Sequence, residues 1–191
     1  MALDTQVRLS ANQRILESAY GLFARRRIRD VGINEVIAQA GVTKATFYSH
    51  FPSKDDLVLA FLKLREQRAT IEWMAAGVRE RGGTPEERLL AIFDLFDEWF
   101  ADEQFESCPF IHVLLEMGPG HPLGRASIRY LGNVRGMVHD LAREAGLRDP
   151  DVFARSFHLL MKGAIVTAVE GDTAAARPAQ ELARLLIEQH R

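Results

Sequence analysis

Apolar residues recur every three or four positions along nearly the whole chain, the spacing that gathers them on one face of an α-helix. No segment shows the sustained alternation of apolar and polar residues that a half-buried strand requires. The sequence therefore predicts an all-α fold, divided into about nine helices by capping residues, glycines and prolines. The expected helices cover residues 10–27, 32–40, 43–50, 53–79, 84–100, 108–117, 122–146, 149–171 and 178–191.

The composition is that of a globular chain, because 191 residues with 47% hydrophobic content are enough to bury a substantial core. The N-terminal residues MALDTQVRLSANQ hold no apolar run of signal-peptide length, and eighteen consecutive apolar residues occur nowhere. We therefore expect neither secretion nor membrane insertion, and a location in the cytoplasm. The single cysteine, Cys108, excludes an intramolecular disulfide and a zinc site of several thiolates. We expect no metal and no cofactor.

The net charge of −2 hides an asymmetry between the two ends of the chain. Residues 1–54 carry eight basic side chains against four acidic ones, whereas the remainder is acidic overall. A basic segment on an acidic body indicates that the segment meets an anionic surface. The alternative is that the basic run from Arg25 to Arg29 is only a solvated helix end, favoured by the helix dipole.

A short helix, a turn at Gly41 and a second short helix from Thr43 form a helix-turn-helix arrangement, whose second helix can enter a major groove of DNA. Lys44 can donate to guanine, and the small Ala45 lets the helix approach base edges. Phe47 lies on the opposite face of this helix and is expected to pack inward. The side chains that offer donors to phosphates are Thr46, Tyr48, His50 and Lys54.

The segment IAQAGVTKATFYSHFPSKDDLVLAF resembles the helix-turn-helix signature of TetR/AcrR-type transcriptional regulators, and the likeness covers about residues 10–62. The resemblance implies a homodimer that binds palindromic double-stranded operator DNA and is usually released by a small ligand. It also implies that Asn34, Lys44 and Ala45 face bases. The positions that it implies for phosphate contacts are Thr43, Thr46, Tyr48, His50 and Lys54.

Two domains are expected, a helix-turn-helix DNA-binding domain at residues 1–57 and a helical ligand-binding and dimerisation domain at 58–191, joined by the long fourth helix. Aromatic and sulfur-containing residues of the second domain offer walls for an apolar cavity, although the same residues serve equally well as core. The candidate ligand contacts are Phe96, Phe100, Phe110, Leu114, Met117, His121, Tyr130, Met137, Phe157 and Met161. The expected effector is therefore a small hydrophobic or aromatic molecule, bound between the fifth and eighth helices.

Three other functions compete with this interpretation. One is an interaction module whose helices bind only protein, which would leave the polar side chains of the 43–54 segment without a purpose. His112 and Glu116 lie four residues apart on an expected helix, which is metal-ligand spacing and offers an acid and a base for a helical enzyme. Cys108 offers a thiol for sensing oxidants or electrophiles. No converging catalytic set accompanies these residues, so we predict no enzymatic activity.

The last two expected helices are more apolar than one subunit can readily cover. Val152 and Val169 on the eighth helix, with Leu182 and Leu185 on the ninth, are examples. We expect these helices to pair across a two-fold axis as a four-helix bundle, which makes the protein a homodimer.

Overall fold

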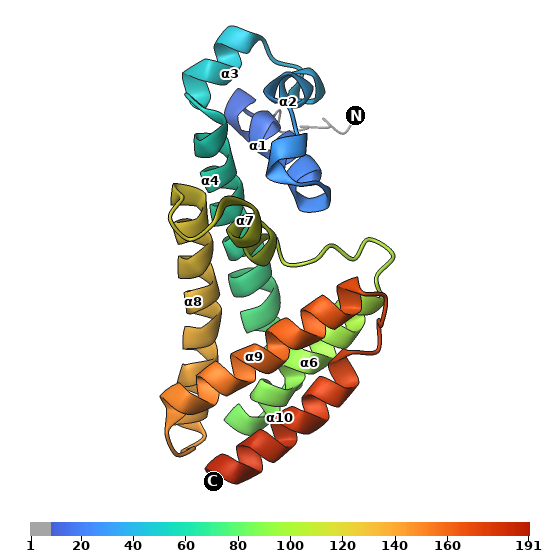
Figure 1. Cartoon of the computed structure of the whole chain (residues 1–191), viewed down its shortest axis with the longest axis vertical. Coiled ribbons are helices and arrows are strands. Elements are labelled where there is room, and N and C mark those ends of the chain that lie inside the picture. The colour runs from blue at the N-terminus through green and yellow to red at the C-terminus, as the bar shows by residue number, and fades with distance from the viewer. Residues whose placement is uncertain (1–8) are drawn as a thin grey trace, which may run out of the picture.

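The computed structural model of the chain describes residues 9–191, in which all regular structure is helical, as predicted. Asp4 and Arg8, two of the charges counted at the N-terminal end, lie outside the described residues. The molecule is elongated, with a small group of helices at one end and a larger bundle at the other (Figure 1).

The first three helices lie at the N-terminal end of the molecule (Figure 1). They are α1 (Ala11–Arg25), α2 (Ile33–Ala40) and α3 (Lys44–His50), and a short 3-10 helix, η1 (Ile28–Asp30), which the sequence did not predict, connects the first two. Gly41 ends α2 with φ of 61°, the left-handed conformation expected of a glycine at this position.

One long helical element joins this group to the rest of the molecule. It begins as α4 (Lys54–Arg65), widens into the π-helical segment η2 (Glu66–Ala75) and ends as α5 (Ala76–Arg81). The sequence predicted this element as one regular α-helix. Wide π-helical turns are rare and are found mostly where a helix borders a functional site.

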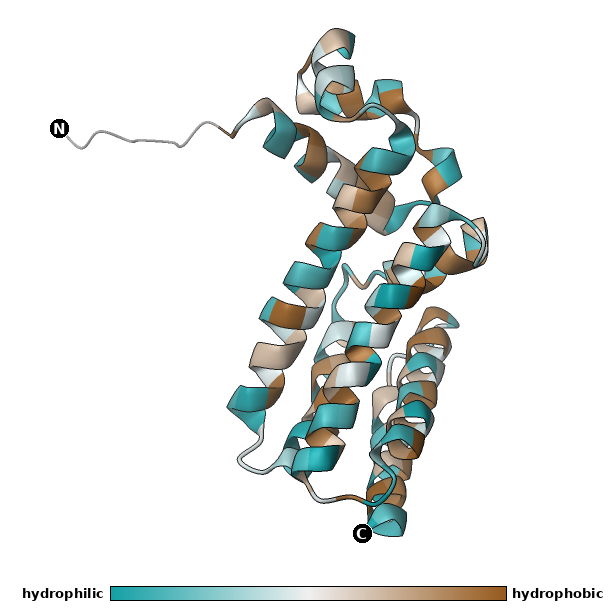
Figure 2. Cartoon of the chain, turned by 90° about the vertical axis from the view of Figure 1, so that its left-hand side faces the viewer, coloured by the Kyte–Doolittle hydropathy of each residue, from teal (hydrophilic) through white to brown (hydrophobic). Residues whose placement is uncertain are grey.

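Five helices make up the remainder, and their starts follow the capping residues seen in the sequence. They are α6 (Pro85–Ala101), α7 (Pro109–Met117), α8 (Pro122–Glu144), α9 (Pro150–Val169) and α10 (Ala176–His190). Thr84 and Glu87 form a complete capping box at the start of α6, as Ser10 and Gln13 do at α1. Hydrophobic and hydrophilic residues alternate around these helices in the manner of amphipathic packing (Figure 2).

The described residues form two hydrophobic clusters rather than one. The C-terminal cluster joins α6, α8, α9 and α10 around side chains such as Phe93 and Phe157. The N-terminal cluster joins α1 to α4 around Phe47 and Phe61, and it also includes Phe110 of α7 and the first half of α8. The N-terminal core thus continues past the expected boundary at residues 57 and 58, which remains a prediction.

Helix α9 is long and apolar enough to cross a membrane by length and composition alone. Forty-four per cent of its most apolar window is buried inside the protein, where Phe153, Phe157 and Met161 belong to the C-terminal cluster. A helix that forms the core of a bundle passes the same test, and the packing of α9 fits that description.

Candidate DNA-binding surface and ligand cavity

Helix α3 is fixed by its two ends and by one buried side chain. The Thr43 hydroxyl accepts a hydrogen bond from the Thr46 amide at 3.1 Å, which caps the helix. Phe47 is completely buried and stacks against Phe51, so the helix is anchored to the N-terminal cluster by one face. The opposite face is free to meet another molecule, and α3 lies at the end of the protein farthest from the C-terminal bundle (Figure 1).

Most of the residues that the sequence assigned to DNA are exposed. Those with exposed side chains are Asn34, Thr43, Lys44, Ala45, Tyr48 and His50, whereas Thr46 and Lys54 are half-buried. The Lys44 ammonium lies 6.0 Å from the centre of the Tyr48 ring, one helical turn away. Burial lowers the pKa of Lys54, although the nearby carboxylates of Glu116, Asp55 and Asp30 oppose this effect. These residues share one end of the molecule, and their contacts to bases or phosphates remain predictions.

Arginines of the basic run from Arg25 to Arg29 pair with acidic side chains of the protein itself, and whether they also meet DNA remains a prediction. The Arg25 guanidinium lies 3.0 Å from Glu106, and Arg29 lies 2.9 Å from Glu116, so both bind the C-terminal part of the chain. Arg26 pairs with Glu35 of α2 at 2.6 Å. These arginines mainly hold the N-terminal helices to each other and to the body, which the sequence did not reveal because their acidic partners are distant along the chain.

Glu116 at the end of α7 forms the most extensive polar contact between the two parts of the molecule. Its carboxylate accepts hydrogen bonds from the Ile28 amide at 3.0 Å and from the Arg29 amide at 2.8 Å, as well as from Arg29 Nε. Burial of the carboxylate acts to raise its pKa, but the hydrogen bonds from Arg29 and Ile28 outweigh it, and the net shift is downward. Glu116 therefore joins α7 to η1.

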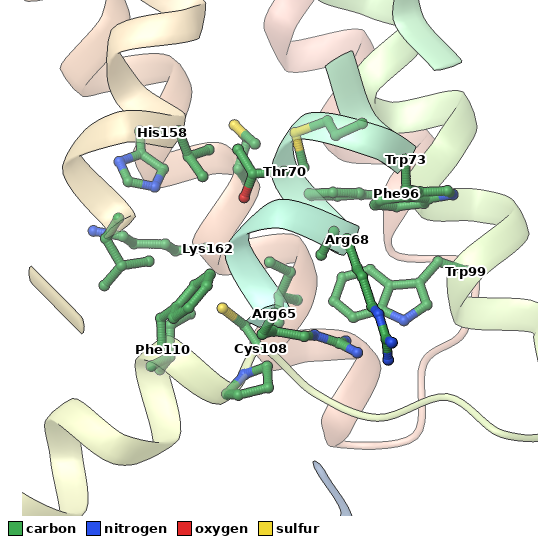
Figure 3. A pocket seen from close by; sticks show the side chains of 18 of the residues that line it. Arg65, Arg68, Thr70, Trp73, Phe96, Trp99, Cys108, Phe110, His158 and Lys162 are labelled. Atoms are coloured by element: carbon green, nitrogen blue, oxygen red, sulfur yellow. The ribbon is translucent and has the colours of Figure 1, made fainter. Parts of the chain in front are cut away.

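A cavity of about 290 Å³ lies between the long connecting element and the C-terminal helices α6 to α9. Its apolar wall contains both tryptophans of the chain, Trp73 from η2 and Trp99 from α6, whose rings meet edge to face with centres 5.9 Å apart. Phe96 and Phe110 complete this wall (Figure 3). The volume is near the lower limit for cavities that hold small ligands, roughly 300 to 1,000 Å³.

The polar side chains in the cavity wall come from two directions (Figure 3). Arg65 and Arg68 extend from the connecting element and both bind α1: Arg65 donates to the Tyr20 hydroxyl at 2.7 Å, and Arg68 donates to both carboxylate oxygens of Glu17. His158 and Lys162 lie one turn apart on α9. The sequence offered His158 as a polar group for this cavity, but it did not identify Arg65, Arg68 or Lys162, because helix spacing does not show which face borders a cavity.

His158 is buried with 4% of its surface exposed, and its ring has no hydrogen-bond partner among the described residues. Burial, and next the positive charges of Lys162 and Arg135, lower the pKa of His158 to about 4. The imidazole is therefore neutral at pH 7. It offers one N–H donor and one acceptor nitrogen.

Three of the ten residues predicted as ligand contacts line the cavity, namely Phe96, Phe110 and Met161. Phe100 and Phe157 are buried in the C-terminal cluster, and Leu114 and Met117 pack on the N-terminal one. The remaining three also lie outside the cavity lining. His121 caps α8 and faces Asp55, and Tyr130 packs on Phe110. Met137 borders a groove between η2 and α8. The aromatic pattern alone did not separate cavity wall from core.

The residues of the enzymatic and thiol alternatives do not converge. Glu116 is occupied by η1, and His112 is exposed on α7. Burial raises the pKa of the Cys108 thiol, so its reactive thiolate form is disfavoured at neutral pH. In the described part of the chain, no three His, Cys, Asp or Glu residues lie close enough to hold a metal ion.

Residues 15–61 match the family described as bacterial regulatory proteins, tetR family. The crystal structure of a TetR-family transcriptional regulator from Streptomyces coelicolor superposes with a TM-score of 0.85 at 26% sequence identity, over 94% of this chain and 95% of that one. The chain belongs to the TetR family. Regulators of this family bind DNA through a helix-turn-helix unit, and the family is not one of enzymes.

Two curated relatives show how far the sequence likeness extends. A helix-turn-helix-type transcriptional regulator of Mycobacterium tuberculosis is 38% identical over 82 residues, which cover 42% of this chain and 39% of that protein. The TetC protein of transposon Tn10 from Escherichia coli is 29% identical over 147 residues, covering 75% of this chain and 72% of that one. The first match thus spans only about two fifths of its relative's length.

Proposed function

We propose that this TetR-family chain is a dimeric repressor, which binds palindromic double-stranded operator DNA and is released when a small apolar ligand enters the cavity. The observation that carries the proposal is the arrangement of α3, with one face anchored by Phe47 and the other exposed. One such helix contacts only a few base pairs, so two copies are needed for useful specificity. We place the proposed repressor in the cytoplasm, where bacterial DNA lies.

The surface of α9 and α10 supports the dimer. Six large apolar side chains on these helices are about half exposed or more: Val152, Leu159, Val166, Val169, Leu182 and Leu185. On α9, Val152, Leu159 and Val166 recur every seven residues and Val169 follows three residues later, which places them in one stripe along the helix. Gly163 lies within this stripe, has open space beside it and lets a second helix approach closely. A four-helix bundle formed by α9 and α10 of two subunits would cover this stripe.

The cavity supports the ligand. It is bordered by the long element that carries α4 into the DNA-binding end, so a molecule bound there touches a helical element that reaches both ends. A hundredfold loss of operator affinity requires a coupling free energy of only about 2.7 kcal/mol. A single small ligand can supply such a coupling if it favours the DNA-incompetent arrangement.

Selection of fragments from the protein's own genome, followed by gel shifts, tests the DNA-binding proposal. We expect sequence-selective binding to a palindromic site, with an affinity that falls steeply as salt rises. An affinity that depends neither on the DNA sequence nor on the salt concentration would contradict the DNA-binding proposal. Light scattering tests the assembly: Leu185→Glu should shift the protein to monomer, whereas Leu115→Glu, at a leucine exposed on α7, should leave the dimer unchanged.

A further inference from the structure

The charges around the cavity are of one sign. Arg65, Arg68 and Lys162 are cationic, and none of the described residues that line the cavity is acidic. The two arginines already bind Tyr20 and Glu17 of α1. Lys162 has no ion pair or hydrogen bond to any described side chain, so its charge is not compensated within the protein.

His158 adds a second, independent observation. It is more than nine-tenths buried, lies one helical turn before Lys162 and borders the same cavity without a hydrogen-bond partner among the residues described. The Ser127 hydroxyl is the unpaired polar atom that is fully covered in the described part of the chain, so the ring nitrogens of His158 reach the open space of the cavity, where a bound molecule can pair with them. The partner must accept a hydrogen bond from the neutral ring or donate one to it. An acceptor also suits the adjacent ammonium of Lys162.

We propose that the effector is a small organic monocarboxylate, whose carboxylate binds His158 and Lys162 and whose apolar body lies against Trp73, Trp99 and Phe110. This inference rests on the proposed ligand-responsive function and names its ligand class. A carboxylate satisfies the His158 N–H and the Lys162 ammonium together, whereas a neutral polar group leaves the ammonium without a counter-charge. The volume of about 290 Å³ limits the body to a compact group such as a single ring with a short chain.

The chain carries its own reporter for this test, because both of its tryptophans line the cavity. Three ligands that share one saturated ring separate charge from shape: 3-cyclohexylpropanoate, 3-cyclohexylpropanamide and 3-cyclohexylpropylamine. None of them absorbs where tryptophan does. Tryptophan emission and calorimetry then give a dissociation constant for each. We expect the carboxylate to bind at least about tenfold more tightly than the amide, which is about 1.4 kcal/mol, and the amine to bind least.

Two lysine variants assign the charge. Lys162→Met keeps the length and the apolar stem of the side chain, and it should reduce the preference for carboxylate over amide to about twofold or less while the amide still binds. Lys63→Met, on the exposed side of α4 and outside this cavity, should keep the full preference. If Lys162→Met keeps the full preference for the carboxylate over the amide, the proposed carboxylate site at His158 and Lys162 is wrong.

The outcomes also separate this inference from the proposed function. If the amide binds wild type as tightly as the carboxylate, and either releases operator DNA, the monocarboxylate is wrong and the ligand-responsive repressor stands. If the carboxylate binds with the expected preference but leaves operator affinity unchanged, the ligand class is supported and the proposed release mechanism fails. If tryptophan emission and calorimetry respond to none of the three ligands, the monocarboxylate site is refuted.

Discussion

Replacing Glu116 by Gln should destabilise the protein by about 2 to 3 kcal/mol at pH 7. The side chain of Glu116 is only 8% exposed, and its carboxylate accepts two backbone N–H groups of η1. A hydrogen bond to a charged group contributes about 1.5 to 3 kcal/mol, and the amide of glutamine keeps an acceptor for only one of the two. The Arg29 side chain is 64% exposed, so its ion pair adds no more than about 1 kcal/mol.

The same contact predicts a dependence on pH whose sign follows from the pKa of Glu116. Hydrogen bonds to Ile28 and Arg29 lower this pKa in the folded protein despite the opposing effect of burial. A lowered carboxyl pKa stabilises the fold above the unfolded value of about 4.3, and the contribution is lost as pH falls through the folded value. The stability difference between wild type and Glu116→Gln should therefore persist from pH 7 to about 5 and shrink below it.

Urea unfolding at equal protein concentration measures both effects, because the midpoint and slope give the free energy of unfolding. Arg29→Ala should cost less than Glu116→Gln, since it leaves both backbone hydrogen bonds in place. Glu103→Gln, at an exposed loop residue, is the matched control and should change stability by less than about 0.5 kcal/mol. Equal stabilities of wild type and Glu116→Gln, or a difference that does not change between pH 7 and 3, would refute the reasoning.

Three further outcomes test other parts of the molecule. Lys44→Ala should relax base preference at one position of each half-site at a cost of about 1 to 3 kcal/mol, whereas Tyr48→Phe should weaken all sequences alike; competition gel shifts distinguish the two. Gly124→Ala should be strongly destabilising in thermal melts, because the added Cβ would lie 1.9 Å from the Gly118 carbonyl oxygen, while Gly136→Ala on the same helix has open space and should gain up to about 1 kcal/mol. A small apolar ligand that raises the melting temperature should also lower operator affinity, and a stabilising ligand that leaves operator affinity unchanged would contradict the coupling.

Local signals predicted the helices well. Ser10, Thr43, Ser53 and Thr84 each accept the backbone hydrogen bond that their positions before a helix predicted, because capping depends on residues only three apart. The helix-turn-helix unit could be predicted for the same reason, because its turn and its cap lie close together in the sequence. The π-helical segment was not, since its residues carry ordinary helix-forming side chains, and nothing in their order marks the wider turn.

The cavity was the least predictable part of the molecule. Phe96 lines it and Phe100, one turn later on the same helix, is core, although both are large apolar residues on one face of α6. Which of them borders the cavity depends on how the surrounding helices pack against one another. The contacts of Glu116 and Arg68 were hidden for a related reason, because each joins residues more than 50 positions apart.

The contacts to α1 give the cavity a direct route to the DNA-binding end. Arg65 and Arg68 lie in its wall, yet their guanidinium groups bind Tyr20 and Glu17 of the first helix. A ligand whose carboxylate binds His158 and Lys162 still places its apolar body in the same cavity as these arginines, so we expect its entry to disturb the pairing of Arg68 with Glu17. Any movement of Arg68 toward the ligand weakens its hold on α1, which packs on α3.

In a dimer the two recognition helices must sit about one DNA turn, ~34 Å, apart. Helix α1 packs on α2, α3 and α4, so we expect a shift of α1 to displace the recognition helix relative to the C-terminal bundle. If both subunits undergo the same displacement, the two shifts add in the distance between the two α3 helices. That distance must match the separation of two successive major grooves for both helices to bind. We therefore expect loss of the pairing between Arg68 and Glu17 to connect a small ligand to the proposed release from DNA, without unfolding of either cluster.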